Sequence, residues 1–143
     1  MKIEPMTEKY REPVLEMMRV FYASPAVSTN GSEEIFRADV DRCLREDPYL
    51  EGFVLTENGG AVGYAMLAKS YSTEFGKPCI WIEDLYLASG YRDRGYGSVF
   101  LRYAAERYPE AILRLEVESE NSRAIHTYRK NGFEELPYME MKR

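Results

Sequence analysis

The spacing of hydrophobic residues near the amino terminus predicts one strand followed by two helices. Residues 2–6 alternate weakly between apolar and polar side chains, as in a short strand. Apolar residues then recur every three or four positions up to about Tyr22, which predicts a helix; its start should be irregular, because Pro13 belongs in a first turn. After a loop over residues 25–31, Ser32 is suited to cap a second helix. The apolar stripe of this second helix consists of Phe36, Val40, Cys43 and Leu44.

The middle of the chain predicts three strands. Residues 52–56 and 61–68 are rich in strand-forming side chains and flank an Asn-Gly pair, which is a strong signal for a hairpin. Residues 80–87 form a further run of this type, apolar at both ends and with two adjacent carboxylates in its interior.

The second half of the chain alternates helices and strands. A glycine-containing turn leads into a helix over residues 96–108, which is followed by a strand over 111–117 and a helix over 121–130. Residues 133–141 predict a broken strand or a hairpin around Pro137. The expected order is therefore β-α-α-β-β-β-α-β-α-β-β, which indicates an α/β or α+β domain with a mixed sheet covered by helices.

Length and charge narrow the class of protein. The 143 residues, 45% of them apolar and 13% aromatic, suffice for a single domain spanning 1–143 without a metal or disulfide to staple it. The net charge of −5 argues against a general nucleic-acid binder and is compatible with a cationic partner. Cys43 and Cys79 lack a paired spacing, and neither a signal core nor an apolar run of about 20 residues is found. We therefore expect a cytoplasmic protein without a disulfide or a membrane span.

The single histidine, His126, excludes several kinds of chemistry. A metal motif with two histidines is impossible, and no G-x-S-x-G elbow accompanies His126 in support of a nucleophile triad. We expect His126 to have a surface or packing role, since it lies two positions from Tyr128 and so on another helix face. The chemistry must then rest on carboxylates, tyrosines, backbone groups or a cofactor, and we expect no metal.

The most distinctive motif is a glycine loop between the last predicted strand of the middle region and the helix that follows. It consists of Arg92, Asp93, Arg94, Gly95, Tyr96, Gly97 and Ser98. The glycines let a ligand approach the backbone, the helix start offers N–H groups to an anion, and two arginines add positive charge. The loop is not a dinucleotide fingerprint, because Phe100 occupies the position of the third glycine. The alternatives are a phosphate or pyrophosphate site and a turn that merely starts a helix.

A second motif lies in the last predicted helix. Asn121 precedes this helix, Ala124 and Tyr128 are four residues apart and share one of its faces, and Gly132 and Phe133 follow its end. By themselves these residues favour a structural interpretation, in which Asn121 is a helix cap and Tyr128 is a core tyrosine.

Together the two motifs resemble the core of the GNAT superfamily of N-acetyltransferases over residues 80–133. The family loop R/Q-x-x-G-x-G/A is matched at Arg92, Gly95 and Gly97. The later family motif N-x-x-A-x-x-x-Y-x-x-x-G-F is matched at Asn121, Ala124, Tyr128, Gly132 and Phe133. Residues 82–87 are similar to the acetyl-CoA-binding strand of this family, especially in polyamine and diamine acetyltransferases. The resemblance implies a mixed, mostly antiparallel sheet flanked by helices.

The resemblance also implies a role for each matched segment. Backbone groups of Leu85, Tyr86 and Leu87 would bind the pantetheine arm of acetyl-CoA like an added strand. In the family this strand carries a bulge and splays from its neighbour. The backbone N–H groups from Arg92 through Ser98 would hold the pyrophosphate, and Asn121 would contact the cofactor. Tyr128 would protonate the departing thiolate, and a strand N–H such as that of Leu85 would stabilise the oxyanion.

The reaction implied is direct attack of an amine on the acetyl thioester, with neither a metal nor an enzyme nucleophile. An alkylammonium of pKa about 10 must first lose a proton, and Glu83 is our candidate base, acting directly or through water. Side chains alternate along a strand, so Glu83 and Asp84 should face opposite sides unless a bulge intervenes. Asp84 and water stay open as alternative bases, and a surface carboxylate is the alternative role for Glu83.

The expected acceptor is a small cationic amine, such as a polyamine, a diamine or an aminoglycoside, because the candidate strand and the whole chain are acidic. The acidic stretch around the second helix is either a solvated face or a contribution to recognising such a polycation. Its members are Glu33, Glu34, Asp39, Glu46 and Asp47. A peptide amino terminus or a lysine side chain is the alternative acceptor, and transfer of a longer acyl group than acetyl is also an open possibility.

Two alternatives belong to other classes of protein, namely a non-catalytic CoA-binding module and another kind of nucleotide-binding domain. The family further suggests a homodimer.

Overall fold

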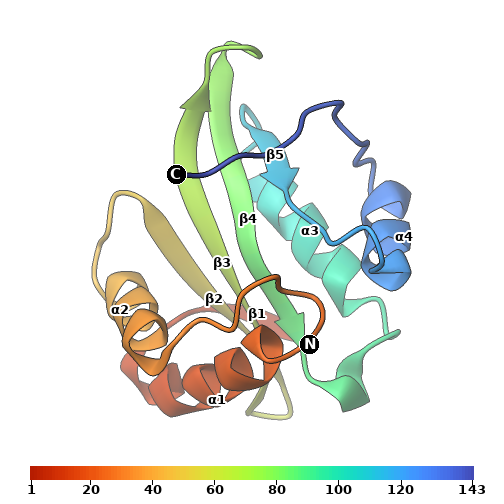
Figure 1. Cartoon of the computed structure of the whole chain (residues 1–143). Helices are drawn as coiled ribbons and strands as arrows, with labels where there is room; N and C mark the ends of the chain where they lie inside the picture. Colours follow the sequence, from red (N-terminus) through yellow and green to blue (C-terminus); the bar gives the residue numbers. More distant parts are fainter.

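A twisted five-stranded sheet forms the centre of the computed structural model, which describes all 143 residues (Figure 1). Its order is β1-β2-β3-β4-β5. The first four strands, β1 (Lys2–Pro5), β2 (Leu50–Glu57), β3 (Gly60–Ser72) and β4 (Lys77–Leu87), pair antiparallel with their neighbours. The fifth, β5 (Ile112–Leu115), is parallel to β4. The mixed, mostly antiparallel sheet that was expected is therefore confirmed.

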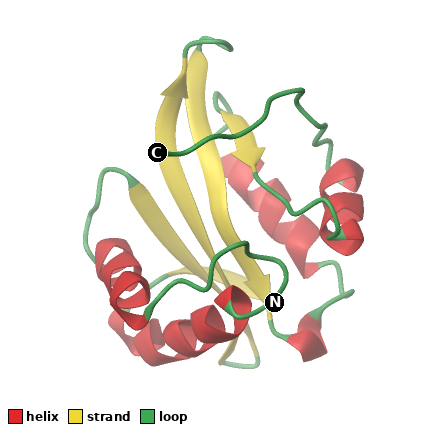
Figure 2. Cartoon of the chain, in the orientation of Figure 1, coloured by secondary structure: helices red, strands yellow, loops and turns green.

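Helices cover both faces of this sheet (Figure 2). On one face lie α1 (Arg11–Tyr22) and α2 (Glu33–Leu44), and on the other lie α3 (Tyr96–Arg107) and α4 (Ser122–Lys130). Two short 3₁₀ turns, η1 (Glu8–Tyr10) and η2 (Ser89–Tyr91), precede α1 and follow β4. Pro13 is the third residue of α1, where its missing N–H needs no partner, and η1 provides the irregular start that the sequence predicted. No helix combines the length and the apolar character that crossing a bilayer requires.

The core is divided into two hydrophobic clusters, one on each side of the sheet. The cluster under α1 and α2 contains Met6, Tyr10, Val14, Leu15, Met17, Met18, Phe36, Val40, Val54, Tyr64, Met66 and Tyr86. The cluster under α3 contains Phe53, Leu55, Val62, Ala65, Leu67, Ile80, Ile82, Phe100, Leu101 and Ala104. Because β2 and β3 contribute alternate residues to each cluster, the sheet is apolar on both faces and its strands are held in one register.

A hairpin turn and a helix cap that the sequence predicted are both confirmed. Asn58 and Gly59 both have positive φ angles, of 51° and 81°, as a two-residue hairpin of type I′ requires. At the start of α2 the hydroxyl of Ser32 accepts a hydrogen bond from the N–H of Ile35 at 3.2 Å.

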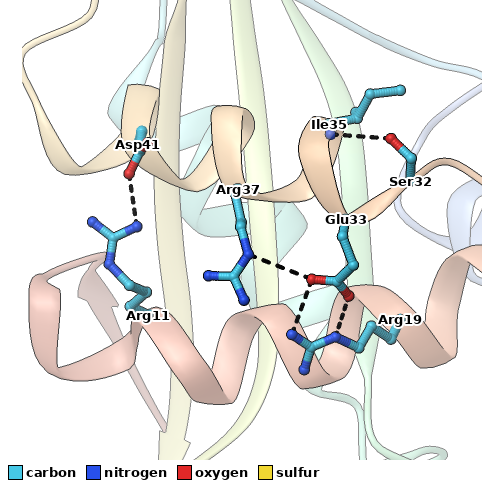
Figure 3. A network of polar contacts seen from close by, with 7 residues as sticks. All are labelled: Arg11, Arg19, Ser32, Glu33, Ile35, Arg37 and Asp41. Atoms are coloured by element: carbon cyan, nitrogen blue, oxygen red, sulfur yellow. Dashed lines mark hydrogen bonds and ion pairs between the residues drawn. The ribbon is translucent and has the colours of Figure 1, made fainter.

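Ion pairs join α1 to α2 (Figure 3). Glu33 of α2 binds Arg19 of α1 through both carboxylate oxygens and lies 3.6 Å from Arg37. Arg11 of α1 donates to Asp41 of α2 at 2.7 Å. Since Glu33 is occupied in this exposed network, it belongs to a solvated helix face, one of the two roles that the acidic stretch was predicted to have.

The prediction of two closing strands was wrong. Residues 133–143 form no strand; they leave α4, cross in front of β5 and β4 in Figure 1, and contact the turn between β3 and β4. There the hydroxyl of Tyr138 donates to Glu74 at 2.8 Å. Pro137 cannot donate to a strand ladder, and the apolar residues after it find no cover, since Met139 and Met141 are each 86% exposed. The observed order thus ends at α4.

A close contact between β3 and β4 makes Gly63 sensitive to substitution. A Cβ at this position would lie 2.4 Å from the carbonyl oxygen of Tyr86, which is backbone and cannot rotate away. We therefore expect Gly63→Ala to lower the free energy of unfolding by roughly 1–3 kcal/mol, as overpacking does. Urea denaturation measures this change. Gly60→Ala is the matched control, because its Cβ would meet nothing closer than 3.7 Å. Equal midpoints for the two variants would contradict the prediction.

Candidate functional site

The strands β4 and β5 diverge and leave an open edge. Their last paired residues are Ile82 and Leu115, whereas β4 continues to Leu87. The N–H of Ala88 donates to β3 at 2.9 Å. Because alternate residues of an antiparallel strand direct their backbone groups to opposite edges, the N–H and C=O groups of Leu87 and Leu85 face the gap between β4 and β5.

A β-bulge interrupts β4 at Glu83. Ile82 pairs with Leu67 and Asp84 pairs with Met66, so that Glu83 is the extra residue between them. The extra residue reverses the alternation of side chains, since Ile82 belongs to the cluster under α3 whereas Asp84 faces α1. The bulge implied by the family resemblance is therefore present, and it lies at the residue predicted to act as the base.

The gap between β4 and β5 opens into a cleft of ≈ 720 Å³, within the range of about 300–1,000 Å³ usual for ligand sites. Its opposite wall is formed by Phe21 of α1 and by Ser24, Pro25 and Ala26 of the loop after α1. All but one of the predicted site residues line this cleft. They are Glu83, Leu85, Tyr86, Leu87, Arg92, Asp93, Gly95, Tyr96, Gly97, Ser98, Asn121 and Tyr128.

The glycine loop leads into α3 with its backbone exposed to the cleft. Gly95 caps the helix with a φ of 79°, a left-handed conformation that favours glycine, and no side chain caps the first turn. The N–H groups of Tyr96, Gly97 and Ser98 belong to this first turn and have no partner within the helix. They are therefore available to an anionic group in the cleft.

Arg92 and Arg94 have different environments. Arg92 lines the cleft, and its Nε donates to the carbonyl oxygen of Leu87 at 2.9 Å. Arg94 is the one predicted site residue that does not line the cleft. Its guanidinium lies 3.4 Å from Glu57 and 5.0 Å from the ring centre of Tyr91. The side chain of Arg94 thus ties the loop to the β2–β3 hairpin.

The helix α4 directs Tyr128 into the cleft, one turn after Ala124, as the four-residue spacing predicted. The ring packs against Phe133 with 5.9 Å between centroids. Burial raises the pKa of the Tyr128 hydroxyl above its usual value. The hydroxyl therefore keeps its proton at neutral pH and is available as a donor.

Two helix amino termini border the same cleft. In addition to α3, α4 begins at Asn121, whose Oδ1 accepts from the N–H of Ala124 at 3.2 Å. The cap role of Asn121 is thus observed, with its side chain at the wall of the cleft. His126 of α4 is exposed and lines the cleft as well. The dipoles of both helices favour negative charge at these ends.

Charged residues of both signs line the cleft. The basic residues Arg92, Arg123 and Lys130 come from the glycine loop and α4, where Asp93 and Glu120 are acidic neighbours, and Arg123 donates to Asp93 at 2.9 Å. After β5, burial raises the pKa of Glu116 to about 7, with further contributions from Glu140 and Glu83. The cleft therefore offers groups to an anion at the glycine loop and carboxyl groups near Glu83.

A smaller cavity of ≈ 230 Å³ adjoins the cleft. It is lined by Tyr22, Asp39, Tyr49, Leu50, Met66, Ala68, Glu83 and Asp84. Glu83 lines both spaces, so the bulge stands between them.

Carboxylates give this smaller cavity an acidic character. Burial, assisted by the charges of Asp84 and Glu83, raises the pKa of Asp39 to about 6, although Arg42 opposes the shift. Burial and the charges of Asp84 and Glu140 also raise the pKa of Glu83. Partly buried carboxylates that repel one another are stabilised by a cation placed between them.

Sequence reasoning missed the contribution of the amino-terminal half to this cavity. The acidic stretch that contains Asp39 was left open as either a solvated face or a contribution to recognising a polycation, without a place in the fold, and Tyr22 was read only as the end of a helix. The one available signal was the position of Asp39 one residue before Val40, which made it a neighbour of the buried stripe of α2.

Comparisons with known proteins agree with this architecture. The model of the acetyltransferase (GNAT) family matches residues 14–133. A streptothricin acetyltransferase of Streptomyces lavendulae is 40% identical over 79 residues, which cover 53% of this chain and 40% of that protein. A thialysine N-epsilon-acetyltransferase of Bos taurus is 34% identical over 116 residues, covering 73% and 66%. The chain thus spans less than two-thirds of the length of these two relatives.

Solved structures share the fold at lower identity. An aminoglycoside acetyltransferase, AAC(6')-Iy in complex with a bisubstrate analogue, superposes with a TM-score of 0.80 at 19% identity, over 99% of this chain and 96% of that one. A probable acetyltransferase superposes with a TM-score of 0.78 at 20% identity, over 99% and 96%.

Proposed function

The chain belongs to the acetyltransferase (GNAT) family, and on this basis we propose that it transfers an acetyl group from acetyl-CoA to a small cationic amine. The observation that carries the proposal is the single cleft that unites the open edge of β4, the glycine loop and Tyr128. Each of these three segments has its own signal in the sequence, and acetyl transfer would require them to lie at one site.

The residues of the cleft fit the parts of acetyl-CoA. The pantetheine arm carries amide groups, and the backbone N–H and C=O groups of Leu85 and the N–H of Leu87 offer them a strand-like partner, whereas the carbonyl oxygen of Leu87 already accepts from Arg92. The first turn of α3 offers N–H groups to the pyrophosphate, and Arg92 adds a positive charge. Acetyl-CoA supplies an activated thioester, whose reactive carbonyl would lie between Glu83 and Tyr128.

The chain's own residues would move two protons. Glu83 takes a proton from the acceptor ammonium, directly or through water, and the freed amine lone pair forms a bond to the carbonyl carbon. The bond from this carbon to sulfur would break as the hydroxyl of Tyr128 gives its proton to the departing thiolate. The second proton of the nitrogen, acidic once the nitrogen is bonded to the carbonyl carbon, would pass to the Tyr128 oxygen directly or through water and restore the hydroxyl. The N–H of Leu85 faces the gap and would stabilise the charge on the carbonyl oxygen.

The acidic cavity supports a cationic acceptor. It adjoins Glu83, so an ammonium group in it would lie beside the proposed base, and Asp39 and Asp84 supply negative charge. The ring of Tyr49 is 69% exposed at this cavity and adds an aromatic surface for a cation. The streptothricin and aminoglycoside acetyltransferases among the similar proteins are named for polycationic antibiotics, which agrees with this class of acceptor.

A peptide amino terminus or a lysine side chain is the second candidate acceptor, because the cleft of ≈ 720 Å³ is large enough to admit more than a single alkylammonium group. The acidic cavity of ≈ 230 Å³ suits an alkylammonium chain, which polyamines and lysine side chains both carry, whereas its several carboxylates favour an acceptor with more than one ammonium group. A non-catalytic CoA-binding module would need neither a tyrosine hydroxyl at position 128 in the cleft nor a carboxylate at the bulge.

The cofactor is tested by thermal melting with acetyl-CoA, CoA, NAD and ADP at matched concentrations. A ligand at 100 times its Kd adds about 2.7 kcal/mol to the free energy of unfolding, which for a chain of this length raises Tm by roughly 5–10 °C. We expect this rise with acetyl-CoA and CoA alone. An equal rise with NAD or ADP would indicate another kind of nucleotide-binding domain, and no rise with CoA would contradict the proposed cofactor.

A further inference from the structure

Asp84 is held between two tyrosines beneath the bulge. The hydroxyl of Tyr22 donates to Oδ1 of Asp84 at 2.9 Å, and the hydroxyl of Tyr64 donates to Oδ2 at 2.7 Å. Only 4% of Asp84 is exposed, and Tyr64 is fully buried. Both carboxylate oxygens are therefore engaged within the protein, in hydrogen bonds that a charged acceptor strengthens.

The two tyrosines come from elements that shape the cleft. Tyr22 is the last residue of α1, and the loop that follows it places Ser24, Pro25 and Ala26 in the wall opposite β4. Tyr64 lies on β3, next to the strand that carries the bulge. Asp84 thus connects the start of this loop to the two strands at the point where Glu83 is inserted.

Sequence reasoning left Asp84 open as an alternative base, but its geometry points to another role. We propose that Asp84 is a positioning residue, which holds Glu83 toward the reacting amine and fixes the end of α1 over the acceptor cavity. A base must reach the amine, whereas Asp84 is covered and both its oxygens accept from tyrosines. Glu83, the adjacent residue, lines both cavities and has no such partners in the hydrogen-bond network.

This inference rests on the proposed acetyl transfer, and its test uses tyrosine variants that leave every carboxylate in place. Tyr22→Phe and Tyr64→Phe each remove one hydroxyl from Asp84. We expect each to lower kcat/KM for a diamine acceptor about tenfold, the effect of losing one hydrogen bond to a charged group, with the KM for acetyl-CoA unchanged. Because Tyr64 is buried and does not line the acceptor cavity, its effect would have to pass through Asp84.

Tyr10→Phe is the matched control. Tyr10 is also buried, and its hydroxyl also donates to a carboxylate, Glu4, at 2.9 Å, but this pair lies at β1, away from both cavities. We expect Tyr10→Phe to affect stability without affecting kcat/KM for the diamine. If it lowers kcat/KM as much as Tyr22→Phe and Tyr64→Phe do, the effect is general destabilisation and the proposal is overturned.

Asp84→Asn separates positioning from base catalysis. If Asp84 is a positioning residue, Asp84→Asn should cause a moderate loss of kcat/KM and retain the acidic limb of the pH profile, since Glu83 still titrates. Loss of this limb would show that Asp84 is itself the base.

Hydrogen exchange of residues 23–26 gives a readout that needs no turnover, and it should be faster in Tyr22→Phe than in Tyr10→Phe. Equal exchange would overturn the anchoring role. If wild-type protein acetylates no amine, the proposed function fails, and the exchange comparison still decides the role of Asp84 as an anchor.

Discussion

Tyr128→Phe should lower kcat for acetyl transfer about 100-fold and leave the affinity for acetyl-CoA nearly unchanged. The phenyl ring keeps the packing against Phe133 and the shape of the cleft, so that only the proton donor is lost. General acid catalysis contributes roughly 10²–10⁴-fold, and we expect the lower end because a thiol of pKa about 8.5 is already a tolerable leaving group.

Steady-state kinetics and the Kd for acetyl-CoA measure the two effects separately. Tyr103→Phe on α3 is the control, since Tyr103 packs in the core without lining the cleft. A kcat for Tyr128→Phe equal to that of wild type would show that Tyr128 is a core tyrosine and not the acid.

Glu83→Gln should lower kcat/KM at pH 7 by about 100- to 1,000-fold and change the shape of the pH profile. A primary amine of pKa about 10 has roughly one molecule in a thousand in the free form at pH 7. Without a base the enzyme depends on that fraction, so kcat/KM of the variant should rise about tenfold per pH unit toward pH 10.

The wild-type profile should instead be level above the pKa of Glu83 and fall below it. The carboxylate is the active form, and its activity is lost as the pH falls through the pKa. Because burial and the charges of Asp84 and Glu140 raise this pKa, the fall should begin at higher pH than for an ordinary glutamate. Asp39 and Glu116 also titrate, near pH 6 and pH 7, so Asp39→Asn and Glu116→Gln must each retain the fall if Glu83 causes it. Glu106→Gln on α3 controls for loss of surface charge, and a profile for Glu83→Gln that matches wild type would exclude Glu83 as the base.

The parts of the site that the sequence predicted are those whose geometry is local. The glycine loop depends on a left-handed residue at Gly95 and on the start of a helix, and both leave a signature within seven residues. The shared face of Ala124 and Tyr128 follows from helical periodicity alone. The sequence identified the individual residues of the glycine loop and of α4 as site residues, and all of them except Arg94 line the cleft.

The remaining features depend on contacts between distant segments. The bulge at Glu83 exists only in relation to the register of β3, and the pairing of Asp84 with Tyr22 joins residues 62 positions apart. No periodicity in either segment encodes such a pairing. A broken strand or hairpin was predicted around Pro137, but the segment forms no strand, since the proline cannot donate to a ladder and the apolar residues after it have no cover. The homodimer stays a prediction.

The central claim is tested most directly by following thiol release from acetyl-CoA with purified protein and one acceptor at a time. Spermidine, a lysine-containing peptide and a neutral amine provide the comparison. The proposed function predicts release that depends on both protein and acceptor, with kcat/KM highest for spermidine, because the acidic cavity beside Glu83 favours a second ammonium group. Release with the peptide but not with spermidine would contradict the assigned acceptor class. No release with any amine, in a protein that binds CoA, would contradict the proposed transferase activity itself.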